Sequence, residues 1–160
     1  PEADVITFQF IKSGGKPAKS YPHNAKARGL FSLFKVSSVE VAIRRRVVEI
    51  LNVTFDSRFG LGTDLPASEE NIFLADIHRK GGKIFFYPEN ILEHPDETSG
   101  YSWTKNSTSS KGALFKRVFG WIGLPLLIVF FLKHFRKFDS GVQFVKAVAI
   151  AIKKFILFRR

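Results

Sequence analysis

The chain has 160 residues, enough for one domain with its own core, and 45% of them are hydrophobic, which excludes an intrinsically disordered protein. It contains no cysteine, so a disulfide framework and a thiolate metal site are both excluded. The net charge of +11 comes from one part of the chain, because residues 1–100 carry 13 basic and 13 acidic residues, whereas residues 101–160 carry 12 basic residues and only Asp139. Those basic residues flank apolar runs, a pattern that favours a membrane surface over nucleic acid.

The first part of the chain predicts a strand, a turn and a short helix. Residues 4–11 alternate between apolar and polar side chains and are rich in β-formers, which is typical of a strand. Residues 13–17 are interpreted as a turn and 18–21 as a returning hairpin strand. We expect a short helix within 25–35, followed by an alternating strand over 37–43.

Two helices and two strands are expected in the middle of the chain. Residues 44–51 place three apolar side chains on one helical face. Ser68 is expected to cap a helix that runs to about Lys80, where Gly81 and Gly82 end it. The strands are predicted on either side of Pro88, at 83–87 and 90–94.

The last part of the chain changes in character. Residues 97–112 are polar and rich in Ser, Thr and Gly, which indicates a linker. The uncharged run 118–132 spans about 22 Å as a helix, short of the bilayer core of about 30 Å. An in-plane or re-entrant segment is therefore expected, with a transmembrane hairpin as the alternative. Residues 141–160 predict a helix with a wide apolar face and a narrow cationic strip, suited either to anionic lipid or to packing on protein.

The most informative stretch is 55–97, because several motifs follow one another in order. A Phe-Asp-x-Arg-Phe-Gly turn begins at Phe55, and a glycine-bearing loop follows it. Two adjacent carboxylates, Glu69 and Glu70, then open the predicted helix, and a late strand ends at His94 and Pro95. Acidic residues in a first helical turn also complement the helix dipole, so the pair alone does not indicate catalysis.

This order resembles the second half of the catalytic domain of family 2 glycosyltransferases, which have the GT-A fold. The resemblance is strongest over residues 36–97. It implies an α/β fold, a partial GT-A-like (Rossmann-like) mixed sheet with flanking helices, followed by amphipathic and hydrophobic helices. Residues 1–100 would be the acceptor-side part of the domain, 101–112 a linker, and 113–160 a basic, hydrophobic, membrane-associating tail.

The resemblance also implies a transferase that moves a sugar from a nucleotide-sugar donor to a glycan or lipid-linked acceptor, typically in cell-surface polysaccharide synthesis. It assigns the general base to Glu70, with Glu69 in support, although the family usually has Asp at the second place. Substrate-binding roles fall to the turn and loop, namely Asp56, Arg58, Phe59, Gly60 and Gly62. Arg58 could instead brace the loop through Asp56.

A divalent cation, Mg or Mn, is expected as cofactor, and His94 matches a possible metal ligand. The remaining ligands would belong to an Asp-x-Asp motif, which this chain does not contain. The chain is therefore expected to be a fragment that is inactive alone. We expect an anionic membrane surface as a partner, no nucleic acid, and a place at the cytoplasmic face of the cell membrane. The alternative function is a non-enzymatic membrane-binding or interaction protein with a small α/β head.

Overall fold

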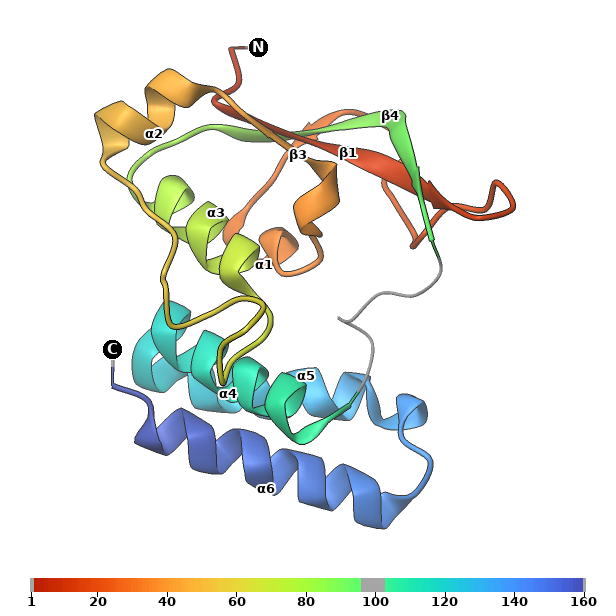
Figure 1. Cartoon of the computed structure of the whole chain (residues 1–160), viewed down its shortest axis with the longest axis vertical. Helices are drawn as coiled ribbons and strands as arrows, with labels where there is room; N and C mark the ends of the chain where they lie inside the picture. The colour runs from red at the N-terminus through yellow and green to blue at the C-terminus, as the bar shows by residue number, and fades with distance from the viewer. Residues whose placement is uncertain (1, 96–102, 160) are drawn as a thin grey trace. The chain divides into compact units, whose positions relative to one another are not determined.

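The chain forms two compact units in a computed structural model that describes residues 2–95 and 103–159. The sheet unit comprises Pro1–Phe55 and Phe73–Thr98, and the loop–helix unit comprises Asp56–Ile72 and Ser99–Arg160 (Figure 1). This division places the loop 56–72 with the helical tail, whereas the sequence predicted it as part of a domain over 1–100.

The sheet unit contains a mixed sheet, which in the described residues has four strands in the order β2-β4-β1-β3. Strand β1 pairs in parallel with β4 and antiparallel with β3, and β2 pairs antiparallel with β4. The strands are β1 (Val5–Lys12), β2 (Lys26–Ala27), β3 (Val41–Ile43) and β4 (Ile84–His94). The predicted mixed α/β sheet with flanking helices is confirmed, and the GT-A likeness stays a prediction.

The core of the sheet unit is largely aliphatic. In this core, helix faces cover alternating residues of the strands. The helices are α1 (Leu30–Leu33), the 3-10 turn η1 (Ser38–Glu40), α2 (Arg45–Leu51) and α3 (Glu69–Arg79), whose first residues belong to the other unit. Buried residues from strands, helices and connecting segments form one cluster: Val5, Leu33, Val36, Val53, Phe73, Leu74, Ile77 and Ile84. The predicted helices over 44–51 and 68–80 are confirmed.

Four predicted strands differ from the structure. Residues 18–21 form no strand, and the returning chain makes one bridge, between Ile11 and Pro17. Residues 38–40 form η1 because Ser37 and Glu40 make a reciprocal capping box, which outweighs the alternating pattern there. The two strands expected around Pro88 are one strand, β4, whose register with β1 shifts beside the proline. Such an irregularity accommodates a residue without an N–H.

The loop–helix unit consists of the loop 56–72 and a series of helices. They are α4 (Lys105–Phe119), the 3-10 turn η3 (Gly120–Ile122), α5 (Gly123–Lys133), the 3-10 turn η4 (Phe135–Lys137) and α6 (Gly141–Leu157). Residues 105–112, predicted as linker, are helical, and Thr104 caps α4 by accepting from the Ser107 amide. The other part of the predicted linker, 97–102, lies outside the described residues.

Helices α4 and α5 run antiparallel, as Figure 1 also shows. Gly120 has φ +62° and ψ −140°, a conformation that ends α4 and that a side chain would disfavour. The Trp103 ring, just before α4, lies 5.5 Å from the Phe131 ring near the end of α5. Helix α6 packs on α4 at Gly112, where an added methyl group would come within 2.1 Å of the Ala151 carbonyl oxygen. The unit is therefore a closely packed helical bundle.

By length and composition, one helical run in the described residues, Lys105–Lys133, is apolar enough to cross a membrane. That run contains the bend at Gly120, so its arms are helices of 15 and 11 residues. Arms of that length extend about 22 and 16 Å. On α6, the buried positions Ala147, Ala151 and Phe155 pack inside the unit, so the predicted apolar face is only partly exposed.

Candidate functional site

The acidic pair occupies the first turn of α3, as the sequence predicted. Glu69 and Glu70 are both half-buried, neither enclosed nor fully exposed. Ser68, directly before them, has φ +86° and is 2% exposed. A non-glycine residue in that conformation carries strain of order 1–3 kcal/mol, and such residues concentrate at functional sites. The backbone is thus held in an uncommon conformation immediately before the two carboxylates.

The glycine-bearing loop closes on itself and approaches Glu69. The Gly60 amide donates to the Leu65 carbonyl at 2.9 Å, and the Thr63 hydroxyl donates to the Gly60 carbonyl at 2.9 Å. Gly60 has φ +112°, and an added methyl group would lie 3.6 Å from the Glu69 carboxyl carbon. Gly62, also predicted as a site residue, is exposed with φ +86°. The loop therefore places its backbone beside the first glutamate.

One oxygen of Glu69 is buried without a hydrogen bond. Within the described residues, Glu69 Oε2 is enclosed by protein and has no partner. A buried acceptor left unsatisfied costs roughly 1–3 kcal/mol. A hydroxyl from outside would therefore meet the partly exposed portion of the pair and not this enclosed oxygen.

Asp56 braces the start of the loop. Its two oxygens accept from Arg58, at 2.8 Å from Nε and 2.6 Å from Nη2, and Oδ2 also accepts from Arg117 Nε of α4 at 3.0 Å. The hydrogen bonds from the Arg58 guanidinium, and next those from Arg117, lower the pKa of Asp56 to about 2. Arg58 therefore has the bracing partner that the sequence offered as one of two alternatives.

Phe59 and Arg58 also contact the end of the chain. Phe59 is 5% exposed, and its ring lies 5.5 Å from that of Phe158. The Arg58 guanidinium lies 4.5 Å from the Phe158 ring and donates to the Arg159 carbonyl at 2.8 Å. The predicted substrate-binding role of Phe59 would use a ring that already packs against protein.

His94 belongs to the sheet unit, whereas the other predicted site residues belong to the loop–helix unit. Its Nδ1 lies 2.8 Å from the Pro95 carbonyl, and its ring meets Phe10 edge-on at 5.9 Å. The described residues contain no group of three His, Cys, Asp or Glu side chains suited to a metal ion. His94 is thus a single imidazole ligand at most.

No family model matches this chain, and no curated protein matches it. The candidate site therefore depends on its own geometry: a strained turn, two carboxylates, an unsatisfied oxygen and a braced loop.

Sequence reasoning missed the two cations that α4 contributes to the site. Lys111 was assigned to a linker, and Arg117 was considered only as a flank of an apolar run. Lys111 Nζ lies 3.4 Å from the Ser68 hydroxyl, and Arg117 binds Asp56. The two cations lie on the same helix, and the sequence does not show this. The Ser- and Thr-rich residues 105–112 do not predict a helix.

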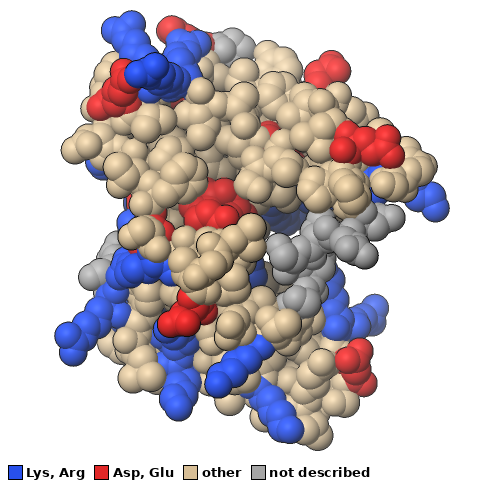
Figure 2. All heavy atoms as spheres, viewed as in Figure 1, with Lys and Arg blue, Asp and Glu red and all other residues tan. Residues whose placement is uncertain are grey.

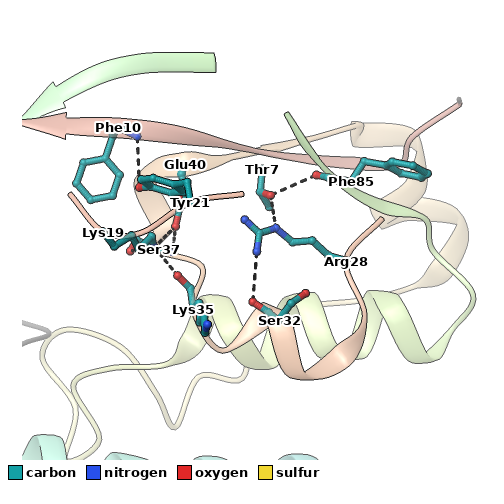
Figure 3. Close-up of polar contacts among 10 residues, drawn as sticks. All are labelled: Thr7, Phe10, Lys19, Tyr21, Arg28, Ser32, Lys35, Ser37, Glu40 and Phe85. Carbon is teal, nitrogen blue, oxygen red and sulfur yellow. Dashed lines mark hydrogen bonds and ion pairs between the residues drawn. The ribbon is translucent and has the colours of Figure 1, made fainter. Parts of the chain in front are cut away.

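It also missed a buried charged cluster in the sheet unit (Figure 3). Glu40 is fully buried, and its Oε1 accepts from Lys19 Nζ and from the Ser37 amide. Arg28 Nε donates to the Thr7 hydroxyl at 2.5 Å. Burial lowers the pKa of Arg28, and the charge of Glu40 opposes that shift. These contacts join the segment after β1 to η1 and serve the scaffold.

Proposed function

We propose that this chain is the acceptor-side part of a glycosyltransferase and that its acidic pair removes the proton from an acceptor hydroxyl. The observation that carries the proposal is the half-buried pair at the start of α3, directly after the strained Ser68 and beside the Gly60 backbone. A carboxylate held in this way can accept a proton from a hydroxyl placed against it.

The proposed reaction forms one bond and breaks another. The acceptor oxygen attacks the anomeric carbon of the nucleotide sugar, and the bond to the diphosphate breaks, so the nucleoside diphosphate leaves with the electron pair. The hydroxyl proton moves to a carboxylate oxygen of Glu69 or Glu70. The strained backbone at Ser68 and the loop at Gly60 would fix that carboxylate before the acceptor arrives.

The assignment within the pair stays open. The resemblance gives the base role to Glu70, whereas the unsatisfied oxygen belongs to Glu69. A divalent cation would neutralise the leaving diphosphate when bound, and His94 is the residue of this chain assigned to it. One imidazole does not make a cation site.

The second part of the proposal is attachment to the cytoplasmic face of an anionic membrane, with the tail lying in the interface. Two observations support it: the arms of the Lys105–Lys133 run are short, and α6 exposes apolar residues beside lysines. The exposed positions are Val142, Val145, Lys146, Ala149, Lys153 and Ile156. Figure 2 shows Lys and Arg side chains distributed over this part of the molecule among uncharged residues.

The exposed face of α6 equally favours the second candidate function, a membrane-binding protein without catalysis, because lipid binding requires no acidic pair. Transfer of labelled sugar from a nucleotide-sugar panel to a lipid extract separates the two. We expect transfer by a protein that joins this chain to a donor-binding half with the Asp-x-Asp motif, and none by the 160-residue chain alone. Glu69→Gln/Glu70→Gln should abolish transfer without changing vesicle flotation. Transfer by the double variant at the wild-type rate would contradict the proposal.

A further inference from the structure

Helix α4 reaches the acidic pair through Lys111. The Lys111 ammonium donates to the Ser68 hydroxyl at 3.4 Å, and Ser68 immediately precedes Glu69. Both residues belong to the loop–helix unit, although 43 positions separate them in the chain. A cation from the tail therefore lies at the strained turn that presents the carboxylates.

The ammonium of Lys111 lies close enough to the acidic pair for their charges to interact. Part of the residue reaches the surface, but burial still lowers the pKa of its amine. The charges of Glu70, and next of Glu69, oppose that shift by favouring the protonated form.

The position of Lys111 is fixed by the packing of α4. The next residue, Gly112, is in close contact with the Ala151 carbonyl of α6. Six residues after Lys111 on α4, Arg117 binds Asp56 at the other end of the loop. Two cations of one helix thus hold the loop at both ends, Lys111 at Ser68 and Arg117 at Asp56.

We propose that Lys111 is a positioning residue for the acidic pair, so that the helical tail completes the candidate site as well as anchoring the protein. The catalytic part of this proposal rests on the proposed function. Lys111 would hold the Ser68 turn in place, and with it the two carboxylates that directly follow this turn. A tail that served only as an anchor would contribute no charge at this point.

The first test concerns position and needs no activity. Amide hydrogen exchange of the intact 160-residue chain is compared for wild type, Lys111→Met, Lys111→Arg and Lys105→Met, an exposed control at the start of the same helix. We expect Lys111→Met to speed exchange at 68–72 about tenfold. Lys111→Arg and Lys105→Met should stay near wild type. Equal exchange in all four proteins would overturn the positioning role.

The second test concerns catalysis and uses the protein with the donor half. Lys111→Met should lower kcat about 10- to 100-fold with KM for the donor nearly unchanged, and Lys111→Arg should restore most of the loss. Full activity of Lys111→Met, while Glu69→Gln/Glu70→Gln is inactive, overturns only the role of Lys111. Full activity of that double variant overturns the proposed function, and the exchange result then still decides the position of Lys111.

Discussion

The two units use charge and packing in opposite ways. The sheet unit has a mainly aliphatic core and places a charged cluster inside, with Glu40 fully buried. The loop–helix unit has an aromatic-rich core around Phe115, Phe131 and Phe155, and its cations hold a loop through the Asp56 carboxylate and the Ser68 hydroxyl. The charges of the sheet unit therefore stabilise a scaffold, whereas those of the loop–helix unit hold the candidate site in place.

Breaking the α4–α6 contact should have the largest effect. Gly112→Val would drive a side chain into the Ala151 carbonyl, and we expect a loss of about 4 kcal/mol in the stability of the loop–helix unit. Both tryptophans of the chain, Trp103 and Trp121, lie in this unit, so urea unfolding followed by Trp fluorescence reports on it. Gly141→Ala, where a methyl group meets no atom within 4 Å, is the control. Equal midpoints for the two variants would refute the tight packing.

Removing the buried carboxylate should act on the other unit. Glu40→Ala leaves Lys19 and the Ser37 amide without their acceptor, and we expect a loss of about 3 kcal/mol. Hydrogen exchange of β1 and β4 amides measures it. Glu49→Ala, which breaks an exposed pair with Arg45, should cost about 0.5 kcal/mol at most. Slower hydrogen exchange of the β1 and β4 amides in Glu40→Ala, or the same loss of stability in Glu40→Ala and Glu49→Ala, would contradict the scaffold role of Glu40.

Neutralising the lysines on α6 should weaken lipid binding without unfolding the bundle. Lys146→Gln/Lys153→Gln removes two exposed cations, each worth about 1 kcal/mol at an anionic surface, so binding should fall about 30-fold. Flotation with anionic vesicles measures it. The control, Lys16→Gln/Lys26→Gln, makes the same charge change in the sheet unit and should have little effect. An equal fall in the control would assign binding to net charge alone.

Asp56→Asn should have the smallest effect, together with a characteristic pH dependence. We expect a loss of about 1 kcal/mol at neutral pH, because the pair with Arg58 is partly exposed. The folded-state pKa of Asp56, about 2, lies below its ordinary value of 3.8, so its contribution is present above about pH 4. The contribution is then lost as the pH falls toward 2. Acid titration of Trp fluorescence tests this, with exposed Asp64→Asn as control, and a gap between wild type and Asp56→Asn that is constant down to pH 2 would disprove it.

The sequence predicted those features that local patterns determine. Helices α2, α3 and α6 and strand β1 follow from periodicity, and the turn after the Phe-Asp-x-Arg motif follows from its glycines. It did not predict η1, because the Ser37–Glu40 capping box competes with the alternating pattern over 37–43. It also could not predict Lys111 beside Ser68, since that contact depends on α4 forming in a Ser- and Thr-rich stretch and packing through Gly112.

The most direct test of the central claim is the single-turnover rate of sugar transfer by the protein with its donor half, for Glu69→Gln and Glu70→Gln separately. Glu89→Gln, an exposed carboxylate in the sheet unit, is the matched control. We predict that at least one of the first two variants transfers sugar about 100- to 10,000-fold more slowly than wild type, with Glu89→Gln within about twofold. Wild-type rates for both Glu69→Gln and Glu70→Gln would contradict the claim.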